Sequence, residues 1–179
     1  MLPKTELYDK FVKDFAYKLK KQVSENEYDK IIFFCIGTDR VTGDSFGPIV
    51  GYKLKYLFKD IEEVEIYGHL EENICANNAN DIIKQIQSKY DRPFVIAIDS
   101  AISKKENIGK IVVENNGMYL GKALNKKINY VGDLSIKGIV SQNVNVPQYN
   151  FKLLQNTSLS LVMNMADVVS SGIYNVINI

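Results

Sequence analysis

The sequence has few of the residues that most often carry metal or nucleophilic chemistry. Its 179 residues include one histidine, two cysteines and no tryptophan. A zinc site of four cysteines, or of two cysteines and two histidines, is therefore excluded within one chain, as is any centre with several histidines. A catalytic triad that uses histidine must use His69. Chemistry in this chain is expected to depend mainly on carboxylates, hydroxyls and backbone amides.

The sequence also lacks an excess of charge of either sign. It has 22 Lys and Arg against 21 Asp and Glu, and Arg40 and Arg92 are its only arginines. Nucleic-acid-binding surfaces usually show a clustered basic excess, so no nucleic-acid partner is expected. No apolar run approaches the length that spans a bilayer, and the first residues lead into an amphipathic pattern without the apolar core of a signal peptide. These features predict a cytoplasmic protein with no membrane partner, and a homo-oligomer is compatible with them.

No repeat, low-complexity tract or Pro/Gly/Ser-rich linker divides the sequence, so residues 1–179 are expected to form one domain. Helical spacing of apolar residues predicts helices over 7–23 (within an N-terminal segment 1–25), 48–58, 73–90 and 157–178. Short apolar runs predict strands over 30–36, 64–67, 94–98, 109–113 and 132–141, whereas residues 118–127 have no clear period and are expected to be loop or partial helix. The order of the first elements is βαβαβ with short connections. This order predicts an α/β fold with a mostly parallel sheet and helices on both faces.

Two loops follow strands of this predicted sheet, and each contains an aspartate. The first runs from Gly37 to Pro48 and includes Asp44, and the second includes Asp99. In open α/β sheets, ligands bind beyond the carboxyl ends of the strands, which is where both loops lie. The first loop is not a phosphate-binding loop, because Asp44 stands where such a loop has lysine, and a GxGxxG motif is also missing. No nucleotide or other cofactor is therefore expected.

Asp44 and Asp99 could act as a catalytic pair. Two acids at neighbouring strand ends can share a proton, which separates their pKa values into those of an acid and a base. Such a pair can activate water against an amide carbonyl, as in aspartic-type peptidases, and Arg40 together with the backbone amides before Phe46 could orient the carbonyl. The alternatives are that Asp44 caps a helix N-terminus and that Asp99 ends a strand and begins a turn.

Three further residues are weaker candidates. Ser45 is one of several hydroxyls in these loops, none of which has a histidine or lysine base nearby in the sequence. Asp133 is a third acid that could approach the pair, although a turn before a strand also accounts for it. His69, with Glu71, could help to hold a metal ion, whereas a lone histidine at a strand end is more often an ordinary polar residue.

Four segments of the sequence carry a family resemblance: CIGTDRVTGDSFGPIVG (residues 35–51), FVIAIDSA (94–101), VGDLSIKGIV (131–140) and LQNTSLSLVMNMADV (154–168). Together they resemble the sporulation protein YyaC family, whose members are often described as spore proteases. That family is similar to the germination protease of spore formers and to the hydrogenase-maturation peptidases. The resemblance implies a three-layer α/β/α sandwich around a mixed, mostly parallel sheet of about five strands.

The resemblance also implies a function. Germination protease cleaves small acid-soluble spore proteins, and its two essential aspartates match Asp44 in GDSFGP and Asp99 in AIDSA by motif position. The implied protein is a protease of spore-forming bacteria that acts on a peptide or small spore-protein substrate. The hydrogenase-maturation relatives use a later histidine to recognise nickel, and this sequence has no histidine after His69. The alternatives are a non-catalytic binding or assembly protein of sporulation that keeps the peptidase fold, and a metal-dependent hydrolase that uses Asp44, Asp99 and either His69 or a glutamate.

Overall fold

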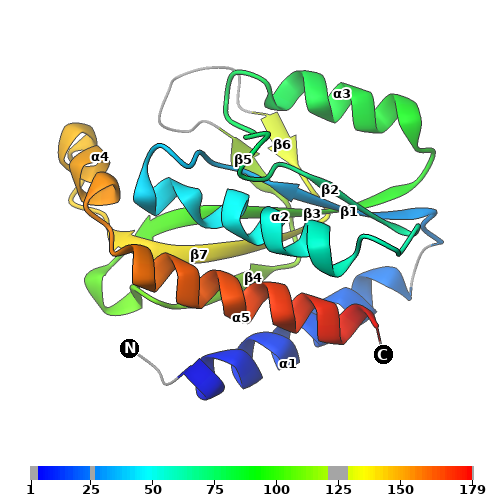
Figure 1. Ribbon diagram of the computed structural model, residues 1–179, viewed down its shortest axis with the longest axis horizontal. Coiled ribbons are helices and arrows are strands. Elements are labelled where there is room, and N and C mark those ends of the chain that lie inside the picture. The colour runs from blue at the N-terminus through cyan, green and yellow to red at the C-terminus, as the bar shows by residue number, and fades with distance from the viewer. Residues whose placement is uncertain (1–3, 25–26, 121–128, 179) are drawn as a thin grey trace.

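A five-stranded sheet forms the centre of the structure (Figure 1). The computed structural model describes residues 4–24, 27–120 and 129–178. The strand order is β2-β1-β3-β7-β4. Strands β1 (Lys30–Cys35), β2 (Val64–Tyr67), β3 (Pro93–Ser103) and β7 (Leu134–Gln142) are parallel, and β4 (Ile111–Glu114) runs antiparallel to β7. The predicted mixed and mostly parallel sheet is confirmed.

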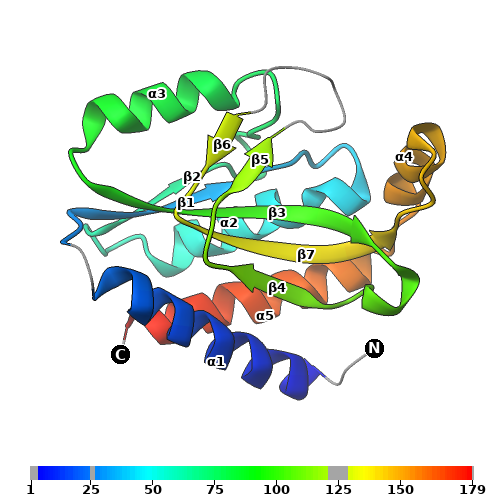
Figure 2. The same cartoon turned by 180° about the vertical axis from the view of Figure 1, so that it is seen from behind.

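Helices cover both faces of the sheet, which gives the three layers that the sequence resemblance implies (Figures 1 and 2). Helices α2 (Phe46–Leu57) and α5 (Leu159–Ile177) lie on one face, and α1 (Lys4–Val23) packs against α5 and β4. Helix α3 (Ala79–Lys89) and the antiparallel hairpin of β5 (Met118–Leu120) and β6 (Asn129–Val131) lie on the other face. A short helix, α4 (Pro147–Gln155), connects β7 to α5. None of the described helices has both the length and the apolar character needed to cross a membrane.

Successive side chains of β1 point to opposite faces of the sheet and pack against the helices there, which explains the continuous apolar run of this strand. Phe33 and Cys35 belong to the core formed with α2 and α5, whereas Ile32 and Phe34 belong to the core formed with α3 and the hairpin. All four side chains are fully buried. A central strand of a parallel sheet needs apolar residues at every position because helices cover both of its faces.

Helix α2 carries two glycines where it packs against the ends of β1 and β2. A Cβ atom added at Gly47 would lie 2.1 Å from the Ile36 carbonyl oxygen, and one added at Gly51 would lie 1.9 Å from the Gly68 carbonyl oxygen. Both obstacles are backbone atoms, which cannot move aside without displacing the strand ends. The two glycines therefore set the distance between α2 and the ends of β1 and β2.

Helix α3 begins later than predicted, at Ala79 instead of residue 73. Hydrogen bonds of the Asn78 side chain hold the preceding segment in a turn: the amide nitrogen of Asn78 donates to the Asn73 carbonyl oxygen, and the Cys75 N–H donates to the Asn78 side-chain oxygen, both at 2.9 Å. Asparagine side chains compete in this way with helical backbone bonds. Ile74 consequently bridges to Ile36 at the end of the sheet, where it is buried.

Three other predictions from the sequence differ from the structure. Strand β3 continues to Ser103 instead of ending before Asp99, because β7 pairs with it along this extension. Residues Met118–Leu120 form β5 and not loop or helix, and residues 121–128, the rest of the aperiodic segment, lie outside the described residues. Helix α4 was not predicted, since its nine residues are too few for a clear apolar period.

The close contact between α2 and β1 predicts the effect of enlarging Gly47. Gly47→Ala should lower the free energy of unfolding by about 1–3 kcal/mol, even though alanine favours the helix intrinsically, because the new methyl group meets the Ile36 carbonyl oxygen. Urea unfolding followed by circular dichroism measures this loss. Gln87→Ala, on the exposed face of α3, is the matched control and should change stability by less than about 0.5 kcal/mol. Equal stability of the two variants would contradict the prediction.

Candidate active site

Asp44 is held at the end of β1 by a tight turn. Gly37, just after β1, has a φ of +134°, and a Cβ atom added there would lie 2.0 Å from the Asp44 carbonyl oxygen. The Thr38 N–H donates to that same oxygen at 3.1 Å, and the Asp44 N–H donates to the Val41 carbonyl oxygen at 2.8 Å. Glycine at position 37 lets the chain fold back through a short 3₁₀ helix, η1 (Thr42–Ser45), which places Asp44 just before α2.

Asp99 lies on the neighbouring strand, inside β3. Strand β1 pairs with β3 as far as Cys35 and Ile98, and Asp99 is the next residue along β3. On its other side Asp99 pairs in register with Lys137 of β7. The alternative in which Asp99 ends a strand and begins a turn is therefore wrong, since β7 keeps the chain extended beyond it.

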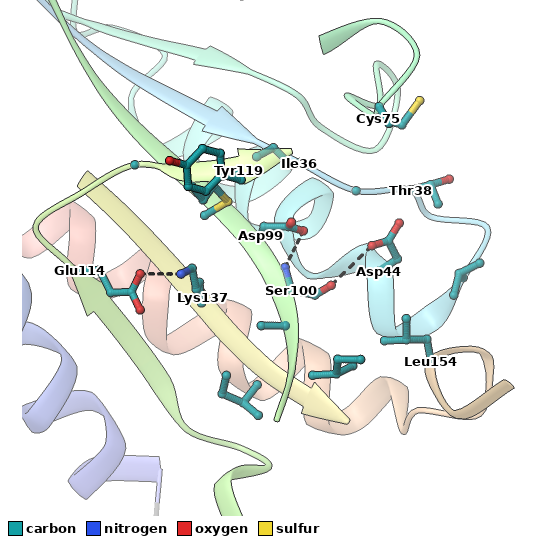
Figure 3. Close-up of a pocket in the computed structure, with 18 of the residues that line it drawn as sticks. Ile36, Thr38, Asp44, Cys75, Asp99, Ser100, Glu114, Tyr119, Lys137 and Leu154 are labelled. Carbon is teal, nitrogen blue, oxygen red and sulfur yellow. Dashed lines mark hydrogen bonds and ion pairs between the residues drawn. The ribbon is translucent and has the colours of Figure 1, made fainter. Parts of the chain in front are cut away.

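Ser100 lies between the two carboxylates and contacts both (Figure 3). Its backbone N–H donates to Asp99 Oδ1 at 2.7 Å, and its hydroxyl donates to Asp44 Oδ1 at 3.4 Å. The residue at the N-cap of α2 is Ser45, which makes no side-chain cap hydrogen bond. The Asp44 carboxylate is thus directed towards Ser100 and Asp99, and the structure brings the two predicted acids together.

The pKa values of both carboxyl groups are raised, and burial is the largest cause for each. The pKa of Asp99 lies well above its usual range, because the negative charge of Asp44 adds to burial; the Ser100 amide and the Lys137 charge act in the opposite direction. For Asp44, the Ser100 hydroxyl and the Thr38 backbone amide stabilise the ionised form against burial. This asymmetry favours one shared proton, held by Asp99, with Asp44 ionised.

An ion pair between Lys137 and Glu114 lies beside the acids (Figure 3). Lys137 projects from β7 opposite Asp99, and its Nζ contacts Glu114 Oε2 of β4. The side chains of Lys137 and Glu114 keep 28% and 43% of their exposure, so the ammonium is accessible from the same side as the acids. The site therefore contains a cation within electrostatic range of Asp99.

The acids form part of the floor of a cleft of about 1310 Å³. The floor also includes Ser100 and continues along β3 to Ile102. One side consists of Met118, Tyr119 and Tyr130 of the β5–β6 hairpin, here called the hairpin wall, and the other of Phe151 and Leu154 of α4, here called the helix wall. The cleft is larger than most pockets for small molecules, which span about 300–1,000 Å³.

Three predicted auxiliary residues do not line the cleft. Arg40 is exposed, and its backbone N–H donates to Thr38 Oγ1 at 3.3 Å. The Ser45 hydroxyl is directed back into η1, where it donates to the Thr42 carbonyl oxygen at 2.7 Å. The Asp133 carboxylate accepts a 2.8 Å hydrogen bond from the Val95 N–H, near the start of β3, and so closes the turn into β7. That bond keeps Asp133 away from the acid pair.

His69 also lies outside the cleft lining. It is 4% exposed, its Nδ1 accepts a hydrogen bond from the Glu71 N–H at 3.3 Å, and its Nε2 lies 3.3 Å from Lys55 Nζ. A lysine ammonium in contact with the imidazole disfavours a metal cation at the same nitrogen. Within the part of the chain that the structure describes, no three His, Cys, Asp or Glu side chains are grouped so that they could hold a metal ion.

Sequence reasoning missed Lys137 and both walls of the cleft. Lys137 could have been noticed as the one charged residue in a strand that is otherwise almost wholly buried. Its position opposite Asp99 depends on the pairing of β3 with β7, strands separated by 30 residues between Ser103 and Leu134, and no local pattern gives that register. The walls come from β5, β6 and α4, which have no clear periodicity.

The fold is similar to that of a protease of known structure. In the crystal structure of a [NiFe] hydrogenase maturation protease, HycI from Thermococcus kodakarensis KOD1, 94% of the chain matches 84% of this one with a TM-score of 0.55 at 20% sequence identity. The chain itself belongs to the DUF1256 family, described as "Protein of unknown function", whose family model matches residues 4–172. It is 40% identical over 144 residues to the "Uncharacterized protein YyaC" of Bacillus subtilis (strain 168), covering 80% of this chain and 67% of that protein. The resemblance to the YyaC family that the sequence motifs indicate is confirmed.

The raised pKa of Asp99 predicts that this residue destabilises the fold at neutral pH. The pKa of this aspartate is higher in the folded state than in the unfolded state. Its contribution to stability is therefore fully present when the pH is below the unfolded-state pKa, and is lost as the pH rises through the folded-state pKa. Asp99→Asn should therefore raise the free energy of unfolding at pH 7, with a gain that shrinks as the pH falls to about 4.

Urea unfolding of wild type and variant at both pH values tests this prediction. Asp60→Asn, at a surface carboxylate with 84% of its side chain exposed, is the control and should change stability by less than about 0.5 kcal/mol at either pH. An Asp99→Asn variant that is less stable than wild type at pH 7 would show that the ionised carboxylate contributes to the fold.

Proposed function

We propose that this protein hydrolyses peptide bonds, with Asp44 and Asp99 as the catalytic pair. The observation that carries the proposal is the arrangement of two carboxyl groups with raised pKa values on either side of Ser100, in the floor of a large cleft. Two buried acids that share one proton supply a base and an acid at the same pH. Peptide hydrolysis needs both of these groups, one for the attacking water and one for the leaving amine.

The asymmetry of the pair assigns the two roles. Ionised Asp44 accepts a proton from a water molecule as its oxygen attacks the carbonyl carbon, and protonated Asp99 donates its proton to the leaving nitrogen as the C–N bond breaks. One water is consumed and one amine and one carboxylic acid are released. The Ser100 hydroxyl holds the Asp44 carboxylate during this exchange. The proton then returns to Asp99 from Asp44 or from solvent.

The similarity to other proteins supports this reading at two levels. The structural neighbour is named as a hydrogenase maturation protease, and at 20% identity it supports the fold as one that can carry peptide hydrolysis. The sequence resemblance to the YyaC family adds a setting: we infer a role in sporulation, in the cytoplasm of a spore-forming cell, with small spore proteins as substrates. Neither a nucleic acid nor a membrane is part of the proposed reaction.

Digestion of a peptide library tests the proposal directly. Wild-type protein is incubated with a pool of unstructured peptides and with small acid-soluble spore proteins from pH 4 to 8, and products are identified by mass spectrometry. Asp44→Asn and Asp99→Asn should each lower the cleavage rate by about 10²–10⁴-fold, because each removes one proton-transfer group. Asp9→Asn, at an exposed aspartate on α1, should leave the rate unchanged. Cleavage that survives both substitutions would remove the pair from the mechanism, and no cleavage by wild type would favour the non-catalytic binding protein.

The Lys137–Glu114 ion pair predicts opposite shifts of the pH profile. Lys137 lowers the pKa of Asp99, so Lys137→Met should raise that pKa and move the alkaline limb of the rate profile to higher pH. Glu114→Gln removes the partner that neutralises Lys137, and should move the same limb to lower pH. Rates measured at half-unit pH intervals reveal both shifts. Limbs that move in the same direction, or not at all, would show that Lys137 does not act on Asp99 through its charge.

A further inference from the structure

Where β3 crosses the cleft, none of the described strands lies beside one of its edges. Strand β1 covers this edge as far as Ile98, whose carbonyl oxygen accepts a 2.7 Å hydrogen bond from the Ile36 N–H. At Gly37 the chain turns away, and the Gly37 N–H donates to the Ile74 carbonyl oxygen instead. Residues 99–103 of β3 pair with β7 on one side, and no strand among the described residues pairs with them on the other.

Two hydrogen bonds show which backbone groups face this free edge. The carbonyl of Ile98 faces β1, whereas the carbonyl of Ser103 faces the β7 side, where it accepts from the Asn143 N–H at 2.7 Å. The extra residue at the register shift is Val140 of β7, so the backbone groups of successive β3 residues continue to face opposite edges of the strand. The backbone groups of Ser100 and Ile102 therefore face the free edge. The Ser100 N–H is taken by Asp99 Oδ1, which leaves the Ser100 carbonyl and both backbone groups of Ile102.

Large apolar and aromatic side chains of the hairpin wall and the helix wall lie on either side of this edge. Tyr119 and Tyr130 are 57% and 49% exposed, and their rings meet edge to face with centroids 5.1 Å apart. Phe151 on the helix wall is 52% exposed. Figure 3 shows Tyr119 on the Asp99 side of the acid pair and Leu154 on the Asp44 side. Large apolar side chains thus remain at the surface on both sides of the acids.

We propose that the cleft binds its substrate as an extended polypeptide that adds a strand to the free edge of β3 at residues 99–103. The segment places apolar or aromatic side chains against the hairpin wall and the helix wall, and its scissile bond beside Asp44 and Asp99. This inference rests on the proposed function, because it describes how the peptide that the acid pair cleaves is held. Strand addition supplies affinity through main-chain hydrogen bonds, and side-chain pockets supply specificity.

The dimensions and charges of the cleft define the class of segment. Five residues of free edge span about 16 Å at about 3.3 Å per residue, so the bound segment must be extended over about five residues, as an unfolded tail or loop can be. Among the residues that the structure describes, the ionisable side chains of the lining are Asp44, Asp99, Glu114 and Lys137. With the shared proton on Asp99, two carboxylates and one ammonium remain charged, and this negative balance favours a segment without acidic side chains.

Backbone methylation of a peptide tests strand addition without altering the protein. The probe is a fluorescent decapeptide pool with Leu, Phe or Tyr at two central positions and Ser, Thr or Lys elsewhere. Its affinity is measured by polarisation on Asp99→Asn and on Asp44→Asn, in which we expect cleavage to be slow. The tightest peptide is then N-methylated at each position in turn. Methylation at each of two positions separated by one residue should weaken binding about five- to tenfold, because those N–H groups pair with the Ser100 and Ile102 carbonyls, and methylation at the residue between them should weaken it by less than twofold. Weakening with no period of two, or no bound peptide in the pool, would overturn the proposal.

Substitutions on the protein locate the strand on β3. Ile102→Pro removes an N–H that faces the free edge and Ile102→Ala keeps it, while both lose the isoleucine side chain; the proline variant should bind the peptide about tenfold more weakly than the alanine variant. Thermal unfolding checks that both variants fold. Tyr119→Ala with Tyr130→Ala should abolish the preference for aromatic peptides, whereas Tyr17→Ala, at an exposed tyrosine on α1, should keep it. Equal binding by the two Ile102 variants, together with a non-alternating methylation pattern, would refute pairing with β3.

The outcomes separate this inference from the proposed hydrolysis. If wild-type protein binds peptides with the alternating methylation pattern but cleaves none, strand addition is supported and the proposed hydrolysis is refuted. If wild-type protein cleaves peptides but the effect of methylation on binding does not alternate along them, the proposed hydrolysis is supported and strand addition is refuted.

Discussion

The site depends on one unfavourable interaction, the approach of two carboxyl groups in a place with little water. Each group would titrate at lower pH if it were exposed, and each raises the cost of ionising the other when both are buried. Such a pair persists only where the surrounding structure fixes it. The pairing of β1 with β3 ends at Cys35 and Ile98, so Asp99 lies just beyond the last pair. The turn at Gly37 places Asp44 over the end of β1. Ser100 then forms hydrogen bonds with both carboxyl groups and so helps to fix their relative positions.

Several close contacts of glycines surround this arrangement. Gly37 and Gly47 lie against backbone oxygens at the end of β1, and Gly43, in the turn that carries Asp44, lies against Leu154. Close contacts between backbone segments leave little room for the loop to adjust. The acid pair is therefore positioned by sheet register and by glycine contacts, with few long side chains involved. Lys137, which lowers the pKa of Asp99, forms an ion pair with Glu114.

Much of the fold could be predicted from the sequence, because its strands are short apolar runs and its long helices have clear apolar periods. β1 and β2 match the predicted strands almost residue for residue, and the parallel order follows from the βαβαβ pattern. Two predictions were wrong for different reasons. The end of β3 depends on β7, which is distant in sequence and extends β3 past Asp99. The start of α3 depends on a local turn, in which the Asn78 side chain bonds to Asn73 and Cys75. Proximity of Asp44 and Asp99 was predicted from strand ends, whereas Lys137, Ser100 as the link, and the two walls depend on tertiary register, which local patterns do not specify. Arg40 and Ser45 share the loop of Asp44, but Arg40 is exposed and the Ser45 hydroxyl bonds to the Thr42 carbonyl oxygen. Asp133 lies in the turn before β7, where its carboxylate accepts from the Val95 N–H.

Leu154 belongs to two parts of the molecule at once. It forms part of the helix wall, and it packs against Gly43, one residue before Asp44. A displacement of this side chain from the cleft therefore also acts on the turn that carries Asp44. In the proposed reaction, a peptide that contacts the helix wall through Leu154 would also shift Asp44 relative to Asp99.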